Sequence, residues 1–303
     1  MLFHNKPNLT GNQKTNLIGK FKTKLTPNQG TPSSPLPPPP LVTSGLVLHL
    51  DGSDNLSLAE GSSTWYDLTS NNYDGTILNG ALYTTDKGGG VAFDGLDDTL
   101  DLGDILNGVI AGTSPTYTVQ AWVKFDTLVD DTLYCFFTKY DTAPSAIAQR
   151  QLFINVRSLP SAPYSYGGFR IEHLPYTSPG LVSGLPQTRF VRSDGDVIEP
   201  NKIHNLTVCF DGSINTNDGL DRPTFYIDGK LQSNVMAASY GPLTNVFLST
   251  INKVALNGYI GTGTIPSAPF AGTTYQTLVY DRVLTQEEVT QNINVLNGRY
   301  DVT

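Results

Sequence analysis

Charged residues and cysteines are scarce in this chain, and long apolar runs are absent. Lys, Arg, Asp and Glu together make up 15% of the 303 residues, and there are two cysteines. No run of about 18 apolar residues occurs, which excludes a candidate membrane-spanning helix. The opening MLFHNKPNLTG also lacks the apolar core of a secretory signal. We therefore expect synthesis in a reducing cytoplasm, with Cys135 and Cys209 as buried thiols and a disulfide between them left open.

Acidic residues are missing from the first 50 positions, although the whole chain carries a net charge of −8. Five lysines lie there, so residues 51–303 hold 19 − 5 = 14 basic and 27 acidic side chains, a balance of −13. This asymmetry predicts that the start of the chain docks on an acidic surface, with a solvated tail as the alternative. No nucleic-acid partner is expected, because the segment lacks arginine. The predicted docking residues are Lys6, Lys14, Lys20, Lys22 and Lys24.

Proline is concentrated in one place. Residues 31–40, TPSSPLPPPP, contain six prolines. This composition favours polyproline II, and ten residues at about 3.1 Å each give a semi-rigid spacer of about 30 Å. We therefore divide the chain into a basic arm (1–30), a proline-rich linker (31–44) and a folded domain (45–303).

Short alternating runs separated by Asp-Gly and Asn-Gly pairs fill the folded domain. Such pairs favour tight hairpin turns. The clearest hairpin has a strand at 223–227, a turn at Asp228-Gly229 and a return strand from Lys230. In the run 117–125, YTVQAWVKF, alternate residues share one face. These patterns predict an all-β fold.

One helix is predicted near the C-terminus, within VLTQEEVTQNINVLNGRY. Thr285 and Glu288 have the spacing of a capping box, and Gly298 is predicted to end the helix. Val289, Ile293 and Leu296 form its apolar stripe. We expect this helix to pack against the β-structure.

From Gly45 to Tyr300, several motifs occur in an order that resembles concanavalin A-like, laminin G-like jelly-roll domains. The segments are GLVLHLDGS, STWYDLTSNNYDGTILNGA, VAFDGLDDTLDLGD, YTVQAWVKF, IHNLTVCFDGS, FYIDGK and TLVYDRVLTQEEVTQNINVLNGRY. The FDG-x-DD turn and the YDR-x-LT ending are similar to those of bacterial and bacteriophage virion proteins. The resemblance implies an antiparallel β-sandwich. The stretch 126–204 is longer than in the usual module.

Enzymatic activity is not expected from the acidic residues. Glycosidases need a pair of carboxylates, and β-glucanases of this fold carry theirs in a Glu-x-Asp-x-Glu pattern. No glutamate begins that pattern. A glycoside hydrolase is accordingly the least favoured function. The glutamates are Glu60, Glu172, Glu199, Glu287 and Glu288.

Two ligand sites remain as hypotheses. The resemblance implies calcium at the rim of the sandwich, where Asp94, Asp97 and Asp98 supply hard oxygen ligands; the alternative is an Asx-bonded turn with solvated carboxylates. A glycan site would use aromatic faces: Trp122, which the resemblance alternatively makes a packing residue, and the Pro- and Tyr-rich stretches 158–168 and 173–187. The tyrosines proposed there are Tyr164, Tyr166 and Tyr176.

The arm, the linker and the resemblance together favour a virion structural protein. The arm would dock on other virion proteins while the sandwich is displayed outward, with capsid decoration or a head fibre preferred over a tail fibre. The alternative is a carbohydrate-binding adhesin or receptor-binding protein that recognises host-surface glycans. A trimer would suit capsid decoration or a fibre, but no heptad repeat specifies one.

Overall fold

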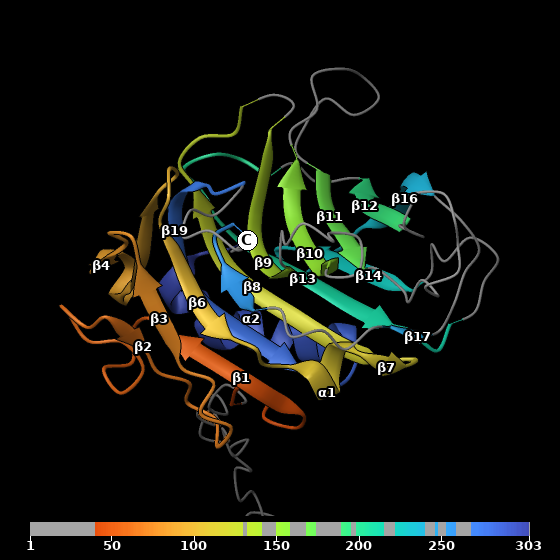
Figure 1. Ribbon diagram of the computed structural model, residues 1–303, viewed down its shortest axis with the longest axis horizontal. Coiled ribbons are helices and arrows are strands. Elements are labelled where there is room, and N and C mark those ends of the chain that lie inside the picture. Colours follow the sequence, from red (N-terminus) through yellow and green to blue (C-terminus); the bar gives the residue numbers. More distant parts are fainter. Residues whose placement is uncertain are drawn as a thin grey trace, which may run out of the picture. The chain divides into compact units, whose positions relative to one another are not determined.

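A computed structural model describes residues 40–129, 132–140, 150–157, 168–173, 189–194, 198–214, 222–239, 246–247, 253–258 and 268–302. They lie within the compact unit Pro39–Thr303. Two antiparallel sheets make up most of this unit (Figure 1). The prediction of an all-β sandwich is confirmed.

Sheet A has eight strands. Their order runs from β15 through β14, β13, β8, β19 and β5 to β4, and β1 also pairs with β19. The first half of β19 pairs with β5 and its second half with β1, so these two strands share one edge of β19. The strands are β1 (Leu46–Asp51), β4 (Leu82–Thr84), β5 (Gly90–Asp94), β8 (Thr116–Phe125), β13 (Ile203–Asp211), β14 (Pro223–Ile227), β15 (Lys230–Leu231) and β19 (Ala271–Tyr280).

Sheet B has nine strands, and β17 (Val246–Phe247) and β7 (Gly112–Thr113) form a separate pair. The order in sheet B is β16, β12, β11, β10, β9, β18, β6, β3 and β2. Their bounds are β2 (Thr64–Trp65), β3 (Gly75–Leu78), β6 (Thr99–Gly103), β9 (Leu133–Tyr140), β10 (Arg150–Arg157), β11 (Gly168–His173), β12 (Arg189–Asp194), β16 (Ser233–Ser239) and β18 (Val254–Leu256).

The main core lies between the two sheets. Strand β8 contributes alternate residues to it, because successive side chains of a strand point to opposite faces. Tyr117 stacks on Phe210 with ring centroids 5.2 Å apart. Both predicted thiols, Cys135 and Cys209, are buried and no disulfide joins them. Core residues from the two sheets include Val119, Ala121, Val123, Phe125, Val208, Val279, Leu100, Phe136, Ile154, Phe169 and Leu256.

The predicted hairpin is confirmed. Strand β14 turns into β15 through Asp228 and Gly229, whose φ angles are 52° and 76°. Both values lie in the left-handed region, which a two-residue primed turn requires and which Gly adopts without strain. The turn is also tied to the sheet, because the Asp228 carboxylate accepts a hydrogen bond from the backbone N–H of Asn205 at 2.8 Å.

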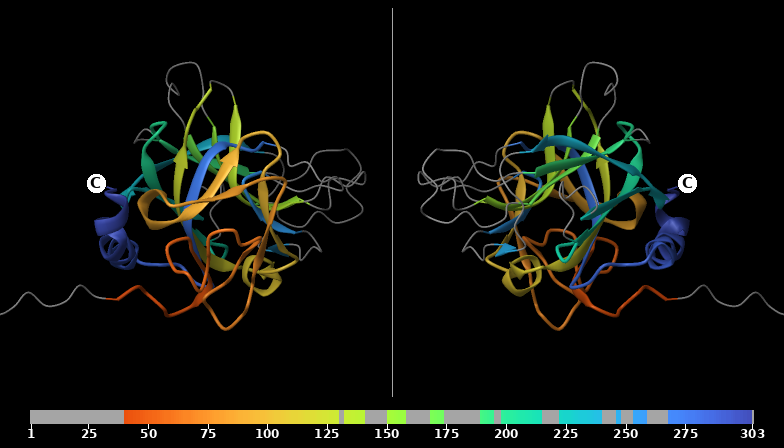
Figure 2. Two further views of the ribbon diagram at one scale, coloured as in Figure 1. Left: turned by 90° about the vertical axis from the view of Figure 1, so that its left-hand side faces the viewer. Right: turned by 90° about the vertical axis from the view of Figure 1, so that its right-hand side faces the viewer.

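Helix α2 (Gln286–Tyr300) covers the outer face of sheet A (Figure 2). Its capping box is confirmed: the Glu288 N–H donates to Thr285 Oγ1 at 3.3 Å and the Thr285 N–H donates to Glu288 Oε2 at 3.0 Å. The expected end at Gly298 is wrong, because the helix continues to Tyr300. A short helix α1 (Asn107–Ile110) and a 3₁₀ turn η1 (Asp86–Gly88) complete the elements.

A second apolar cluster fills the space between α2 and sheet A. It joins the predicted helix stripe to residues of β8, β13 and β19. The segment before β1 also enters this cluster, since Val42 is buried there. Leu41 and Val42, which the sequence assigned to the linker, therefore pack on the sandwich. The cluster includes Trp122, Cys209, Tyr275, Leu278, Tyr280, Leu284, Val289, Ile293, Leu296 and Tyr300.

Within the described ranges, no helix has the length and apolar character needed to cross a membrane.

Candidate functional site

Several predicted site residues lie outside the residues that the structure describes. They are the five arm lysines and the three loop tyrosines, namely Lys6, Lys14, Lys20, Lys22, Lys24, Tyr164, Tyr166 and Tyr176. The remaining four predicted residues, Trp122, Asp94, Asp97 and Asp98, are described.

Trp122 is not an exposed platform for a ligand. Its side chain is 0% exposed and lies in the cluster beneath α2. The Tyr300 ring from the last turn of α2 covers it, with ring centroids 6.0 Å apart. The expectation of an open sugar-stacking surface at Trp122 is therefore wrong, and its alternative role as a packing residue is the one observed. The physical reason is that α2 occupies the sheet face on which this side chain projects.

Asp94, Asp97 and Asp98 gather at the turn between β5 and β6, and we call this group the acidic turn. One carboxylate oxygen from each lies within 4.8 Å of the others. Asp94 Oδ1 accepts the Leu96 N–H at 2.7 Å, which is the Asx bond expected of a turn. Asp98 Oδ2 in turn accepts the Asp94 N–H at 2.8 Å. The Asx bond of the alternative interpretation is therefore observed, but its solvated carboxylates are not all observed, because Asp98 is buried.

Asp98 is the unusual member of the acidic turn. Its side chain is 3% exposed, and its Oδ1 accepts no hydrogen bond from any residue described here. Burial raises the pKa of Asp98 above its ordinary value, and the nearby charges of Asp94 and Asp97 act in the same direction. A hard cation such as calcium binds carboxylate oxygens and would offset this repulsion. The three side chains thus fit a calcium ligand set in chemistry.

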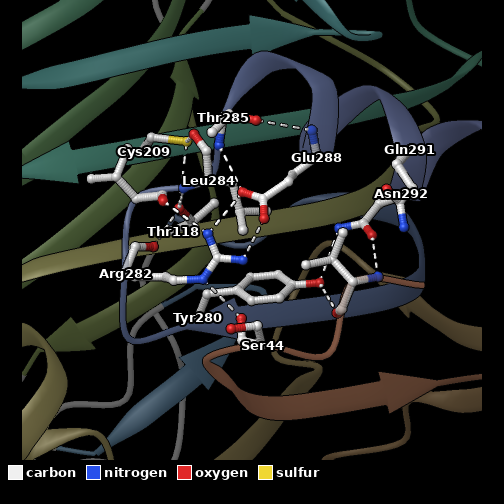
Figure 3. A network of polar contacts seen from close by, with 12 residues as sticks. Ser44, Thr118, Cys209, Tyr280, Arg282, Leu284, Thr285, Glu288, Gln291 and Asn292 are labelled. Atoms are coloured by element: carbon white, nitrogen blue, oxygen red, sulfur yellow. Dashed lines mark hydrogen bonds and ion pairs between the residues drawn. The ribbon is translucent and has the colours of Figure 1, made fainter. Parts of the chain in front are cut away.

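A network of polar contacts fixes the chain where it enters the sandwich, and Figure 3 shows it. Asn292 on α2 is the centre: its Oδ1 accepts the Val42 N–H at 2.9 Å, and its Nδ2 donates to Tyr280 Oη at 2.9 Å and to Gln120 Oε1 at 2.8 Å. Tyr280 Oη then donates to the Val42 carbonyl at 2.9 Å. Both backbone polar groups of Val42 are therefore held by buried side chains.

Arg282 extends this network toward the start of α2. Its Nε donates to the Ser44 carbonyl at 2.9 Å, and its two terminal nitrogens contact the two carboxylate oxygens of Glu288 at 2.7 and 2.6 Å (Figure 3). Gln291 donates to the Pro40 carbonyl at 2.6 Å from an exposed position. We call the contacts of Asn292, Tyr280, Arg282 and Gln291 with residues 40–44 the clamp. The two parallel contacts between Arg282 and Glu288 fix the orientation of the Arg282 guanidinium in addition to the attraction between the two charges.

The clamp lacks the chemistry of a nucleophilic site. Burial raises the pKa of the neighbouring Cys209 thiol to about 11, so the thiol stays protonated at neutral pH. Burial also raises the pKa of Tyr280 well above its ordinary value. The Arg282 guanidinium lowers the pKa of Glu288 and keeps it ionised. These groups hold fixed protonation states, which suits a structural joint.

No family model and no curated protein matches the chain. Among solved structures, Trypanosoma rangeli sialidase in complex with sialic acid aligns at 15% identity and TM-score 0.50, over 84% of this chain and 33% of that one. The botulinum neurotoxin serotype G binding domain aligns at 11% identity and TM-score 0.52, over 82% and 50%. Domain 4 of AbnA, an arabinanase of Geobacillus stearothermophilus, aligns at 19% identity and TM-score 0.47, over 83% and 99%.

These similarities concern the fold. The chain spans about one third of the sialidase and half of the toxin domain. At identities this low, fold and function are separable, and the site residues must carry any functional argument. The neighbours therefore support the β-sandwich and leave its role to be argued from the clamp and the acidic turn.

Proposed function

We propose that this chain is a non-enzymatic virion structural protein whose N-terminal arm docks on a capsid or another virion assembly and whose sandwich is displayed outward. Capsid decoration or a head fibre is preferred over a tail fibre. The observation that carries the proposal is the clamp, because it fixes the end of the proline-rich linker where that linker joins the domain.

Display of the domain at a set position needs both a stiff linker and a fixed joint. A polyproline segment keeps its direction over several residues, whereas a flexible linker does not. That stiffness sets the position of a domain only if the joint is also fixed. Here Pro40 and Val42 are each held by a side chain from α2, and Ser44 is held by Arg282 from the turn between β19 and α2. A fixed joint after a stiff spacer is the arrangement that a displayed module needs.

Retention on purified particles tests this function. Mass spectrometry of purified virions should find the chain at a defined copy number. Deleting residues 1–30 should abolish retention of the chain on particles, because the lysine-bearing arm supplies the contact. A matched variant that keeps the arm but carries Asn294→Ala, an exposed substitution on α2, should be retained like the unchanged chain. Undiminished retention of the deletion variant would contradict the proposal.

Carbohydrate binding is the second candidate function. It is favoured by the shared fold with a sialidase solved in complex with sialic acid and with a toxin binding domain. We place the contact at Tyr164, Tyr166 and Tyr176, because tyrosine offers a large amphipathic face at low cost in conformational entropy. Glycan-array binding that is lost in Tyr164→Ala and Tyr176→Ala would support this candidate. Binding that survives both substitutions would remove the tyrosines from the site.

A further inference from the structure

A buried lysine of sheet B reaches the segment that follows β6. Lys139 on β9 is opposite Val254 on β18, and Val254 is opposite Gly103 at the end of β6. The Lys139 side chain is 0% exposed, and its Nζ donates to Asp104 Oδ1 at 2.6 Å and to the Ile105 carbonyl at 2.9 Å. Lysine is almost never buried so completely unless it is paired. The register of three strands therefore brings the amine of β9 to the residues just after β6.

The same oxygen of Asp104 also accepts a hydrogen bond from a side-chain amide. Asn107, the first residue of α1, donates from Nδ2 to Asp104 Oδ1 at 2.8 Å. The amine of Lys139 and the amide of Asn107 therefore both contact one carboxylate oxygen. Transfer of an acyl group from an amide to an amine needs a nucleophile, an acyl donor and a group that moves protons between them. These three side chains supply the three groups in contact.

The amide oxygen of Asn107 gives a second, independent observation. This Oδ1 atom is buried and has no hydrogen-bond partner within the described part of the chain. Buried polar atoms are almost always paired, so an unpaired one needs an explanation. A carboxyl group becomes a donor when it takes up a proton. A protonated Asp104 could therefore donate to this oxygen, which sits on the same carbon as the nitrogen that Asp104 already contacts.

The protonation states of the two charged groups fit these roles. Burial lowers the pKa of Lys139, although the bond to Asp104 opposes the shift. Burial by itself would raise the pKa of Asp104, but the hydrogen bonds from Lys139 and Asn107 hold it below its ordinary value. A desolvated lysine is activated as a nucleophile, because a larger share of it is the neutral amine. Asp104 rests as a carboxylate and is able to accept the proton that Lys139 releases.

We propose that Lys139 and Asn107 react with each other to form an amide cross-link within the domain, with Asp104 as the proton carrier. A proton moves from Lys139 Nζ to Asp104 Oδ1, and the freed lone pair attacks Asn107 Cγ. The Nζ–Cγ bond forms, the Cγ–Nδ2 bond breaks, and Nδ2 leaves as ammonia after taking the proton from Asp104. Asp104 then passes the surplus proton of Nζ to the ammonia. The products are the amide, an ammonium ion and the original carboxylate, so no oxidant or cofactor is needed.

The cross-link would tie β9 to the start of α1 across 32 positions of the chain, since 139 − 107 = 32. Closing such a loop constrains the unfolded chain in the way that a disulfide does. It would do so without cysteine, and Cys135 and Cys209 are both free thiols. The reaction needs no access from solvent, because all three groups belong to the folded chain. This inference goes beyond both functions proposed above and depends on neither.

Intact-mass spectrometry of the purified full-length chain tests the reaction. We expect a mass lower than the sequence mass by one ammonia molecule, and proteolysis should release a branched peptide that joins Lys139 to Asn107. Lys139→Arg keeps the charge but cannot lose its proton, so this variant should have its full sequence mass. Asn107→Ser leaves the Lys139–Asp104 pair in place and should also have its full mass, which keeps the test valid if Lys139→Arg fails to fold. The control Asn294→Ala, on the exposed face of α2, should lose ammonia like the unchanged chain.

The time course of the mass change tests the role of Asp104. Chain made by cell-free translation starts without the cross-link, and the loss of ammonia can then be followed at neutral pH. Asp104→Ala should lose ammonia about a hundredfold more slowly, because proton transfer by a positioned side chain contributes about 10²–10⁴-fold to a rate. An equal rate in this variant would overturn Asp104 as the proton carrier.

Two other reactions of the same residues would be recognised. Gly108 follows Asn107, and attack of its backbone nitrogen on Asn107 Cγ would form a succinimide with the same loss of ammonia. A succinimide opens in mild alkali, gives no branched peptide and would persist in Lys139→Arg, so this result would overturn the proposal. Loss of one water molecule would mean that Lys139 had joined Asp104 and would overturn it as well. So would a full sequence mass in the unchanged chain after prolonged incubation at neutral pH.

Discussion

The clamp and the acidic turn are two polar clusters of the same domain that differ in how far their buried polar atoms are hydrogen-bonded. In the clamp, Asn292 uses both ends of its amide on partners that are themselves bonded. In the acidic turn, Asp98 is similarly buried, but its Oδ1 has no partner among the described residues. The difference teaches that burial of a polar side chain does not by itself mark a binding site. A buried network whose members satisfy one another holds a fold together, whereas a buried carboxylate oxygen without a partner indicates a place for a cation.

The largest expected effect comes from breaking the clamp at its centre. Asn292→Ala removes partners from the Val42 N–H, Tyr280 Oη and Gln120 Oε1, all of which stay buried. We expect the free energy of unfolding to fall by about 3 kcal/mol, since each unsatisfied buried group costs about 1–3 kcal/mol and some relaxation occurs. Urea denaturation followed by circular dichroism measures this loss. A loss below about 1 kcal/mol would mean that the clamp is not a network in which the contacts depend on one another.

The acidic turn should respond to calcium, and the clamp should not. If the turn binds calcium, the ion at a hundred times its dissociation constant stabilises the fold by about 2.7 kcal/mol. Asp98→Asn keeps an acceptor for the Asp94 N–H but removes the charge, so we expect the calcium-dependent rise in Tm to disappear in this variant. Differential scanning calorimetry with calcium and with a chelator measures both proteins. An unchanged Tm in the natural sequence would exclude calcium at this turn.

The sequence predicted the inner architecture better than the outer layer. Alternation in 117–125 correctly grouped the residues of β8 that share one face, and the structure shows that this face meets the core between the sheets. The glycan-site hypothesis required an exposed Trp122 on the opposite face, which is wrong, and the packing role that the resemblance implied is the one observed. The neighbouring residues on that face, Gln120 and Thr118, are polar. In the structure their partners are Asn292 and the turn before α2.

The prediction of helix α2 was likewise correct for its local features and wrong where a distant contact decides. Its start was predictable, because a capping box is a local pattern with fixed spacing. Its end was not, because Gly298 is exposed and tolerated within the helix while Tyr300 extends it by packing on Trp122. That contact joins residues 178 positions apart, since 300 − 122 = 178. The clamp was missed for the same reason: Asn292 beside the stripe residue Ile293 was its one sequence signal, and its partners lie far away in the chain.

The clamp and the acidic turn should also respond to acid in opposite directions. The folded-state pKa of Glu288 is lowered by Arg282, so its contribution is present above the ordinary value of 4.5 and is lost as the pH falls through the lowered pKa. The folded-state pKa of Asp98 is raised by burial, so its contribution is present below the ordinary value of 3.8 and is lost as the pH rises through the raised pKa.

Two variants separate these contributions. Glu288→Gln should cost about 1 kcal/mol near neutral pH, a figure limited by the partial exposure of the pair, and should flatten the acid side of the stability profile. Asp98→Asn, measured without calcium, should remove the loss of stability that Asp98 causes as the pH rises. Urea midpoints between about pH 2 and pH 6 measure both profiles. Parallel profiles for the two variants would mean that neither carboxylate sets the acid response of its cluster.

The smallest effect is expected at the edge of the clamp. Gln291 donates to the Pro40 carbonyl from an exposed position, so water replaces the bond when Gln291→Ala removes it. The free energy of unfolding should change by less than about 0.5 kcal/mol, as for most surface substitutions. Comparison with Asn292→Ala, one residue further along the same helix, then isolates burial as the cause of the larger loss. Equal losses of stability in the two variants would instead mean that any contact with residues 40–44, buried or exposed, causes the loss. The distinction between a satisfied buried network and a solvated contact would then be wrong.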